Sequence, residues 1–164
     1  MICLTVIVDE NLAIGYENRL LAHIPEDLKH FKEVTSGKVV VMGYNTYLSL
    51  PPKSRPLPNR TNVVLTRKDI AIDGVTVKHS VEEVLDMIKE DYAGQEVIIM
   101  GGQSIYTQFM PYADKLYITH VFRKFKADAY FPEISPEWEI TELKGKRINV
   151  SSEYPHVFAT YEKK

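Results

Sequence analysis

The stretch Val97-Ile98-Ile99-Met100-Gly101-Gly102-Gln103-Ser104-Ile105-Tyr106 joins a β-branched run, two glycines and the start of an apolar helical pattern. A short run of valine and isoleucine without polar alternation is typical of a parallel strand that is buried on both faces. Two glycines let the backbone approach a ligand closely, and the helix that follows offers free N–H groups to a phosphate. A tight strand-to-helix turn explains the stretch equally well, so alone it predicts an α/β unit.

A second strand–glycine–helix junction occurs at Met42-Gly43-Tyr44-Asn45-Thr46, where we expect a capping residue to begin the helix. Ligands of open α/β sheets bind at the carboxyl ends of the strands, so two such junctions can hold the two ends of one diphosphate. A further strand ends in Leu65-Thr66-Arg67-Lys68. Its adjacent cations can meet an extra phosphate, such as the 2′-phosphate of NADP, although a solvated turn is the simpler interpretation of this pair alone.

Strand-like runs alternate with helical patterns along most of the chain. The expected strands are Ile2–Val8, Lys38–Met42, Asn62–Thr66, Val75–Lys78, Val97–Met100 and Leu116–Val121. The expected helices are Pro25–Thr35, Thr46–Leu50, Val81–Tyr92 and Ser104–Met110. This alternation predicts an α/β fold with a largely parallel sheet.

The third helix and the tail carry additional local signals. Ser80 and Glu83 form a capping-box pattern before the helix, and Gly94 is placed to end it. Polar and apolar residues alternate at Trp138–Leu143 and His156–Glu162, as in antiparallel edge strands. We therefore expect one domain over residues 1–164 with an antiparallel C-terminal edge.

Composition excludes several classes of function. The chain has 164 residues, 45% of them hydrophobic and 26% charged, which is ordinary for a soluble globular protein. A net charge of −2 without a basic block argues against nucleic acid or an anionic membrane as the main partner. No apolar run approaches the roughly 20 residues of a membrane span, and the N-terminus lacks the pattern of a signal peptide.

Cysteine and histidine give no sign of a disulfide or a metal site. Cys3 is the only cysteine, so no internal disulfide is possible and a cytoplasmic location is expected. We interpret Cys3 as a small core residue. The five histidines show no spacing typical of a metal site, and we expect none.

An aspartate lies on the apolar side of the first expected helix. The apolar residues of this stripe, spaced three or four apart, are Ile24, Leu28, Phe31 and Val34. Asp27 falls within the stripe, so its carboxylate loses hydration and its pKa should rise. Such a group can hold or pass a proton near neutral pH. The alternative is that Asp27, close behind Pro25 in the first turn, only favours the helix dipole.

Arg60 ends the stiff segment Pro56-Leu57-Pro58-Asn59-Arg60. An arginine on such a loop can grip a carboxylate with two parallel hydrogen bonds. A surface arginine that makes no such contact is the default alternative.

Several short motifs follow one another in a definite order along the chain. They are Ile14-Gly15, Pro25-x-Asp27-Leu28-x-x-Phe31-Lys32, Val41-Met42-Gly43-x-x-Thr46, Pro56-Leu57-Pro58-x-Arg60, Gly101-Gly102-x-x-Ile105-Tyr106, Leu116-Tyr117-Ile118-Thr119 and Ala127-Asp128-x-Tyr130-Phe131-Pro132. Their order and spacing closely resemble those of bacterial dihydrofolate reductase over essentially the whole chain. The resemblance implies a single-domain, mostly parallel eight-stranded sheet with an antiparallel C-terminal edge and about four flanking helices.

The same resemblance implies an activity. NADPH would supply hydride to 7,8-dihydrofolate and give 5,6,7,8-tetrahydrofolate for one-carbon metabolism. The implied protein is a cytoplasmic monomer without nucleic acid, membrane or metal partners, and a target of antifolates. The mobile loop Asn11–Ala22 would close over the nicotinamide, and the Gly101–Gly102 bond would be cis.

The resemblance also implies a set of site residues. Asp27 and Thr119 are the implied catalytic pair, in which Asp27 bonds the pterin 2-amino group and N3 while Thr119 supports the carboxylate. The implied substrate-binding residues are Thr5, Asp27, Leu28, Phe31, Leu50, Leu57, Arg60, Met100 and Thr119, with Arg60 on the glutamate α-carboxylate. The implied cofactor-binding residues are Ile7, Ile14, Gly15, Leu20, Gly43, Tyr44, Thr46, Leu65, Thr66, Arg67, His79, Met100, Gly102, Gln103, Ser104, Ile105 and Tyr106, with Arg67 on the 2′-phosphate.

The chain departs from the family pattern at a few positions. Leu21-Ala22 stands where the family usually has Pro-Trp, so we expect a wider site that holds trimethoprim-type inhibitors less tightly. Tyr44 stands where an arginine is common and His79 where a lysine is common, and both changes weaken the positive pocket for NADPH.

Two other functions stay open from the sequence. One is a reductase for a different pterin-like or pyrimidine substrate, as in the riboflavin-pathway reductases. The other is a catalytically silent binding module. Asp27 together with Arg60 favours folate, because a glutamate-tailed substrate explains both residues, and the retained Asp27 and Thr119 argue against a silent module.

Overall fold

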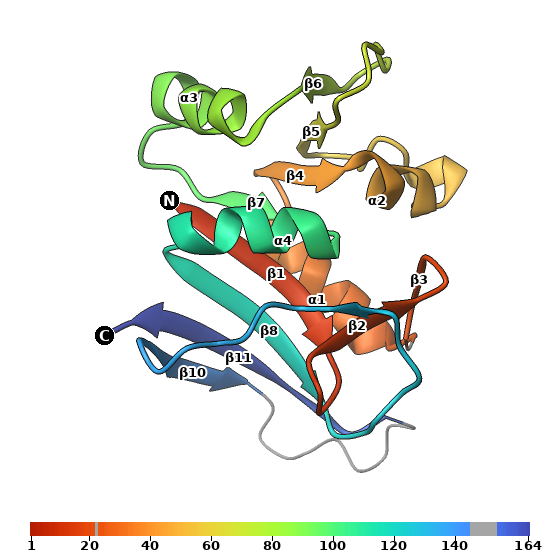
Figure 1. Cartoon of the computed structure of the whole chain (residues 1–164), viewed down its shortest axis with the longest axis vertical. Helices are drawn as coiled ribbons and strands as arrows, with labels where there is room; N and C mark the ends of the chain where they lie inside the picture. The colour runs from red at the N-terminus through yellow and green to blue at the C-terminus, as the bar shows by residue number, and fades with distance from the viewer. Residues whose placement is uncertain (22, 145–153) are drawn as a thin grey trace.

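An eight-stranded sheet forms the centre of the computed structural model, which describes residues 1–21, 23–144 and 154–164 (Figure 1). Its strands are β1 (Ile2–Val8), β4 (Val39–Gly43), β5 (Thr61–Leu65), β6 (Thr76–Lys78), β7 (Val97–Ile99), β8 (Lys115–Val121), β10 (Trp138–Lys144) and β11 (His156–Lys163). Their order is β10-β11-β8-β1-β7-β4-β5-β6. Pairing is parallel from β8 to β6 and antiparallel for β11 with β8 and β10. The expected sheet is thereby confirmed.

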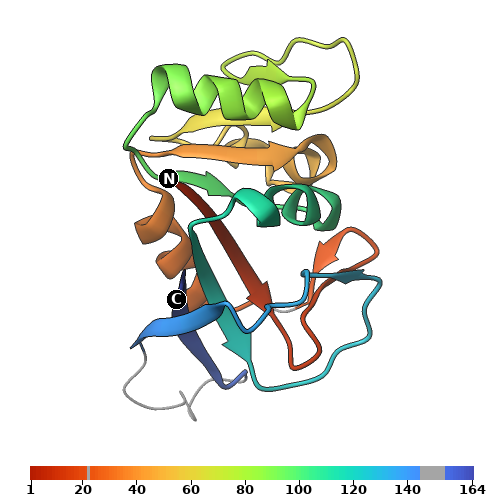
Figure 2. The same ribbon diagram turned by 60° about the vertical axis from the view of Figure 1, so that its left-hand side comes forward.

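Within the described residues, four α-helices cover the two faces of this sheet (Figures 1 and 2). They are α1 (Pro25–Thr35), α2 (Tyr44–Ser49), α3 (Val81–Asp91) and α4 (Gln103–Phe109), with short 3-10 turns η1 (Pro52–Ser54) and η2 (Met110–Tyr112). Buried residues of α3 and α4 belong to one apolar cluster, and those of α1 and α2 belong to another. The sheet is therefore enclosed between two helical layers.

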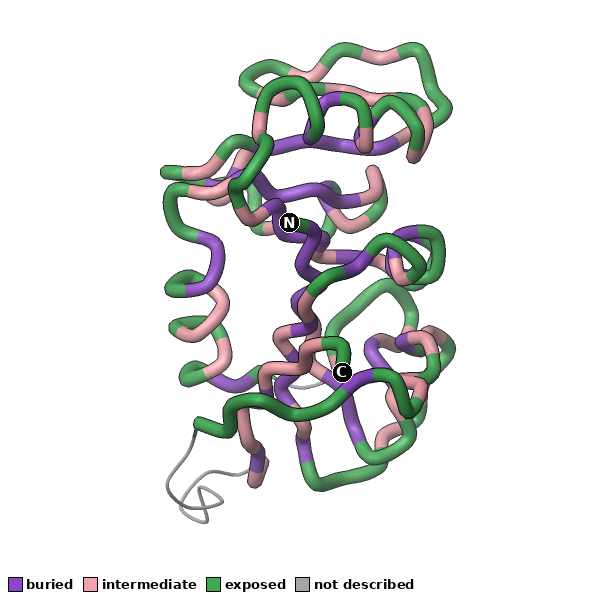
Figure 3. Tube along the Cα trace, turned by 90° about the vertical axis from the view of Figure 1, so that its left-hand side faces the viewer, coloured by how far each residue is buried: buried purple, intermediate pink, exposed green. Residues whose placement is uncertain are grey.

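The continuous apolar runs follow from this enclosure. Successive side chains of a strand point to opposite faces, so Val39 and Val41 of β4 join one cluster while Val40 and Met42 join the other. All four are buried. In Figure 3 the buried residues run along these central strands.

The helix ends predicted from local sequence patterns were only partly correct. The α1 bounds agree with the prediction, and Ser80 Oγ accepts the Glu83 N–H at 3.1 Å, as a capping box requires. The capping residue expected after Gly43 was wrong, because α2 begins at Tyr44 with Gly43 itself as N-cap. A Cβ on Gly43 would lie 3.2 Å from Cγ1 of Ile105, so a side chain at this N-cap position would require Ile105 to shift by a few tenths of an ångström.

A small antiparallel sheet was not predicted. It contains β2 (Ala13–Tyr16), β3 (Arg19–Leu20) and β9 (Ala129–Tyr130) in the order β3-β2-β9. Strands of two to four residues carry too few alternations to be recognised, and β9 pairs with a segment far away in the chain. This sheet places most of the expected mobile loop beside the segment that follows β8.

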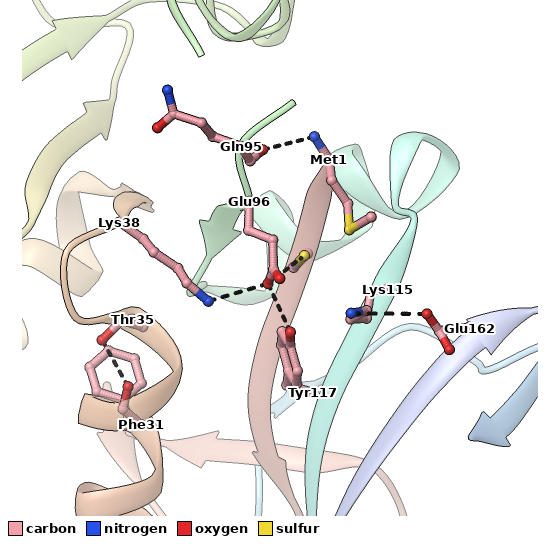
Figure 4. Close-up of polar contacts among 10 residues, drawn as sticks. Met1, Phe31, Thr35, Lys38, Gln95, Glu96, Lys115, Tyr117 and Glu162 are labelled. Atoms are coloured by element: carbon pink, nitrogen blue, oxygen red, sulfur yellow. Dashed lines mark hydrogen bonds and ion pairs between the residues drawn. The ribbon is translucent and has the colours of Figure 1, made fainter. Parts of the chain in front are cut away.

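A polar network joins the strands at the end of the sheet opposite the candidate site (Figure 4). Glu96 Oε1 accepts hydrogen bonds from the Tyr117 hydroxyl at 2.8 Å, the Lys38 ammonium at 3.4 Å and the Cys3 thiol at 3.5 Å. Burial, followed by the charge of Glu96, raises the pKa of Cys3 to about 12. The thiol is thus an unreactive core group, as predicted.

Candidate active site

The two glycine junctions lie side by side because β4 and β7 are neighbours in the sheet. The Gly43 N–H donates to the Gly101 carbonyl at 2.9 Å, and the Met100 N–H donates to the Val41 carbonyl at 2.9 Å. The Gly101–Gly102 peptide bond is cis, as expected. Two motifs that are almost 60 residues apart in the sequence therefore form one surface at the carboxyl ends of adjacent strands.

This surface is shaped by backbone. A Cβ on Gly102 would lie 3.5 Å from Thr46 Oγ1, and Gly101 has a φ of 119°, which side-chain-bearing residues rarely adopt. Neither Gly43 nor Gly102 offers a side chain to cap the helix that follows it. The arrangement leaves a cradle of backbone that a Cβ would narrow, and such a cradle fits a diphosphate.

A cluster of polar and aromatic groups lies where β5 ends. The Lys68 ammonium is 5.3 Å from the ring centre of Tyr44, within the range of a cation–π contact. His79 Nδ1 is 2.9 Å from the Thr66 carbonyl, and the Lys68 N–H donates to Thr66 Oγ1 at 3.2 Å. Arg67 is exposed beside them. The expected 2′-phosphate residues thus come together, with Lys68 as an additional cation that faces Tyr44.

Asp27 meets Thr119 across 92 positions of sequence. The Thr119 hydroxyl donates to Asp27 Oδ1 at 2.6 Å. Thr119 is buried on β8, in register with Ile7 of β1, and Asp27 enters from the first turn of α1. Burial raises the pKa of Asp27 and outweighs the opposing effects of the Thr119 hydrogen bond and of His30. The carboxyl group can therefore exist in either protonation state closer to neutral pH than an ordinary aspartate.

The apolar stripe of α1 is less buried than its pattern predicted. Ile24 and Val34 are buried, but Leu28 is 50% exposed and Phe31 is half-buried. Asp27 is likewise half-buried. The middle of the stripe extends beyond the packed core, which leaves apolar surface next to the carboxylate for a ligand to cover.

Arg60 lies at the far end of the same helix. Its Nε donates to the Pro58 carbonyl at 2.8 Å and an Nη donates to Thr35 Oγ1 at 3.2 Å. The guanidinium carbon is 6.0 Å from the ring centre of Phe31, and burial lowers the pKa of Arg60. The carboxylate of Asp27 and the guanidinium of Arg60 therefore lie at opposite ends of α1, with the ring of Phe31 between them.

Other expected substrate residues gather near α1. Leu57 is buried in the apolar cluster under α1, and the partly buried residues packed against that cluster include Phe31, Leu50 and Met100. Thr5 is buried, and its carbonyl accepts the Tyr106 hydroxyl at 2.7 Å. Burial, then the charge of Asp27, raises the pKa of Tyr106. The phenol stays protonated and joins α4 to β1.

The remaining expected cofactor residues differ in how far they are buried. Ile14, Leu65 and Ile105 are buried, whereas Leu20 is 67% exposed. The side chains of the first turn of α4 are engaged within the protein, because Gln103 Oε1 accepts the Tyr130 N–H at 2.8 Å and Ser104 Oγ accepts from Gln108 at 2.9 Å. The expectation that Ala22 widens the site falls outside the described residues.

Two aspartates that hold the expected mobile loop received no role from the sequence. Asp9 is buried at the end of β1 and accepts backbone N–H groups from Asn11 and Ala13. Asp128 Oδ2 accepts the Glu17 N–H at 3.1 Å. An acid two residues before a turn is a known signal of a side chain bonding to nearby backbone, so Asp9 was recognisable.

Other features of the described residues lie away from this site. A hollow of about 260 Å³ lies between α1 and strands β8, β10 and β11, and its walls include none of the expected site residues. Among residues 1–21, 23–144 and 154–164, no helix has both the length and the apolar character to cross a membrane. Within those ranges no three histidine, cysteine or acidic side chains are grouped as metal ligands would be.

Both the sequence and the structure of this chain match known proteins. The family model described as dihydrofolate reductase matches residues 1–163. A dihydrofolate reductase of Bacillus subtilis is 37% identical over 166 residues, which cover 100% of this chain and 95% of that protein. One from Staphylococcus aureus is 36% identical and covers 94% of both chains. The solved dihydrofolate reductase of Enterococcus faecalis complexed with NADP(H) has a TM-score of 0.87 and 36% identity, over 99% of this chain and 96% of that one.

Proposed function

The chain belongs to the dihydrofolate reductase family, and from this premise we propose that it reduces 7,8-dihydrofolate at the site beside Asp27. The reaction adds a hydride at C6 of the pterin and a proton at N5, giving 5,6,7,8-tetrahydrofolate for one-carbon metabolism. The observation that carries the proposal is the 2.6 Å hydrogen bond from Thr119 to a half-buried Asp27 whose pKa is raised.

Asp27 and Arg60 divide the recognition of the substrate. Asp27, as the catalytic residue, would accept hydrogen bonds from the pterin 2-amino group and N3. The carboxylate would hold the pterin in place while a proton reaches N5 from water. Thr119 is a positioning residue, since it acts through Asp27. Arg60 would pair with the glutamate carboxylate, and the apolar side chains of Leu28 and Phe31 would cover the rings between these anchors.

The cofactor that fits the chain is NADPH. When bound, it supplies the hydride. Its diphosphate would rest on the backbone around Gly43 and Gly102, where a Cβ would narrow the cradle. The 2′-phosphate would meet Arg67 and the neighbouring Lys68. Ile14 and Gly15 would contact the nicotinamide and exclude water from the reacting atoms.

The domain organisation, the oligomeric state and the cellular compartment are also proposals. We propose that residues 1–164 act as one reductase domain, as a monomer in the cytoplasm. The lone thiol of Cys3, buried and free of any disulfide, fits a reducing compartment.

A single assay tests the proposed function. Purified protein should oxidise NADPH only when dihydrofolate is present, with one tetrahydrofolate formed for each NADPH consumed. The absorbance of NADPH and chromatography of the folate product measure the two quantities. NADPH oxidation without tetrahydrofolate would contradict the folate assignment, and folate binding without NADPH oxidation would indicate a silent binding module.

A further inference from the structure

Asp9 is a buried carboxylate whose partners are all backbone N–H groups. It directly follows β1 and is 3% exposed. Oδ1 accepts the N–H of Asn11 at 2.7 Å and of Ala13 at 2.9 Å, while Oδ2 accepts the N–H of Phe125 at 2.9 Å. None of the ion pairs found among the described residues involves Asp9. Its carboxylate is therefore held by three N–H groups from two separate segments.

The segment that Asp9 holds carries unusual backbone. Leu12, Glu17 and Asn18 have φ values of 62°, 50° and 63°. Among the described residues, the one other non-glycine residue with this left-handed backbone is Asn59. The conformation is unfavourable for leucine in particular, because its Cβ approaches the following carbonyl oxygen. Segment 10–18 therefore keeps its shape because other contacts outweigh this cost.

Besides the pairing of β2 with β9 and the Phe131 N–H, which donates to the Leu12 carbonyl at 2.8 Å, two side-chain anchors hold the segment. At the base, Asp9 bonds Asn11 and Ala13 on either side of Leu12 and also bonds Phe125 in the segment after β8. At the tip, Asp128 accepts the Glu17 N–H at 3.1 Å and donates its own N–H to the Gly15 carbonyl at 3.0 Å. Strand β2 lies between the anchors and beside β9 (Figure 2).

The base anchor also fixes where β2 stands relative to the main sheet. The Asp9 N–H donates to the Ala13 carbonyl at 3.1 Å, and the Leu12 N–H donates to the Asp9 carbonyl at 3.1 Å. The Glu10 N–H donates to the Arg123 carbonyl at 3.0 Å. Ile14 follows directly after this closed turn, so a change at Asp9 passes to Ile14 without an intervening flexible link.

We propose that Asp9 is a positioning residue that places Ile14 and Gly15 against the nicotinamide of bound NADPH. This proposal rests on the proposed function, because the contact of Ile14 and Gly15 with the cofactor belongs to it. Asp9 touches neither substrate nor cofactor, and it acts through the backbone of segment 10–15.

The test compares Asp9→Asn with the unsubstituted protein. An amide of the same size keeps one acceptor oxygen but turns the other position into an NH₂ group that faces a backbone N–H. We expect the Kd for NADPH to rise about tenfold or more, because the lost hydrogen bonds to a charged acceptor make the binding conformation of segment 10–15 less favourable. The Kd for dihydrofolate should stay within about twofold, because α1 and Arg60 are not altered. Calorimetry or fluorescence titration measures both.

Two control variants separate positioning from general loss of stability. Ile88→Ala removes buried surface on α3, away from β2, so it should lower the melting temperature without changing either Kd. Asp9→Ser keeps a single acceptor oxygen and should repeat the pattern of Asp9→Asn, which provides a second test if the asparagine variant folds poorly.

Hydrogen exchange of the ligand-free protein gives a readout that does not depend on activity. In Asp9→Asn the amides of Ala13 and Phe125 should exchange faster, while those of β4 and β7 should not change. An unchanged NADPH Kd despite faster exchange at Ala13 and Phe125 would overturn the positioning role, as would equal losses for NADPH and dihydrofolate. Failure of the unsubstituted chain to bind NADPH would overturn the proposed function itself, and the role of Asp9 with it.

Discussion

Asp27 differs from the other carboxylates of α1 in what it faces. Glu26 and Glu33 are exposed to solvent, whereas Asp27 lies against the hydroxyl of Thr119 and is removed from much of its hydration. Burial is the largest influence on its pKa and raises it. The position of Asp27 on the helix thus distinguishes it from the exposed acids and places its carboxylate where a pterin ring could bind.

Replacing Asp27 by asparagine should separate catalysis from stability. We expect turnover at neutral pH to fall by about 100-fold or more, because the pterin loses the anchor that orients C6 toward the cofactor. The raised pKa means that the folded state binds the proton more tightly than the unfolded state, so ionisation costs stability as pH rises above about 3.9. The asparagine variant should therefore be as stable as the parent at pH 7, or more stable. Urea unfolding and steady-state rates measure this, and an unfolded variant with unchanged activity per folded molecule would make Asp27 structural.

The cofactor's extra phosphate gives a second test at the scale of one residue. Arg67→Ala should weaken NADPH by roughly 10–150-fold and NADH hardly at all, since a charge-assisted hydrogen bond contributes about 1.5–3 kcal/mol. Lys68→Ala is the matched control, because Lys68 is engaged with the ring of Tyr44. Equal losses for NADPH and NADH in Arg67→Ala would place the phosphate elsewhere, and a larger selective loss in Lys68→Ala would assign it to that lysine.

At the scale of elements, contacts at opposite ends of the strands have different tasks. The carboxyl ends of β4 and β7 present glycine backbone, which leaves space for a ligand. At the other end Glu96 joins Lys38, Cys3 and Tyr117, and so links the segments that contain β1, β4, β7 and β8 (Figure 4). The carboxyl ends of β4 and β7 thus present backbone, whereas side-chain hydrogen bonds connect the strands at the opposite end.

Glu96→Gln should expose the role of this network through its pH dependence. Burial works to raise the pKa of Glu96, but the Tyr117 hydrogen bond and the charge of Lys38 outweigh it and the pKa is lowered. Its stabilisation is therefore present at pH 7 and lost as pH falls through the folded-state pKa. We expect the variant to be about 1–3 kcal/mol less stable at pH 7, with a difference that shrinks below about pH 4. A difference that does not depend on pH would show that the charge of Glu96 is not involved.

At the scale of the whole molecule, the proposed cofactor site joins parts of the chain that are far apart in sequence. It draws on β2, on the ends of β4, β5 and β7, and on the first turns of α2 and α4. A ligand that binds all of them favours the folded state alone, since no unfolded chain brings them together.

NADPH should accordingly raise the melting temperature. At 100 times its Kd, a ligand of the native state adds about 2.7 kcal/mol, which for a chain of this length corresponds to roughly 5–10 °C. NADH at the same concentration should give a smaller shift. Differential scanning fluorimetry with both cofactors provides the measurement, and identical shifts for NADPH and NADH would argue against a specific 2′-phosphate site.

Much of the fold follows from signals within a few residues. The bounds of β1 and α1, the cap of α3 and the two tail strands all agree with local patterns, which are an apolar run, a helical stripe, a capping box and polar–apolar alternation. Those patterns are local because a strand or helix exposes its faces at a fixed spacing. The motif order added the family, and with it the eight-stranded sheet.

The sequence by itself thus determined the strands of the main sheet, the four helices in their order, and the candidate site residues, but not the small sheet of β2, β3 and β9. Only the tertiary structure decided which of them meet. The bond between Asp27 and Thr119 spans 92 positions, and the bond between Asp9 and Phe125 spans 116. Such contacts leave no periodic trace along the chain, because they depend on how the strands are ordered and paired in the sheet rather than on the spacing of neighbouring residues.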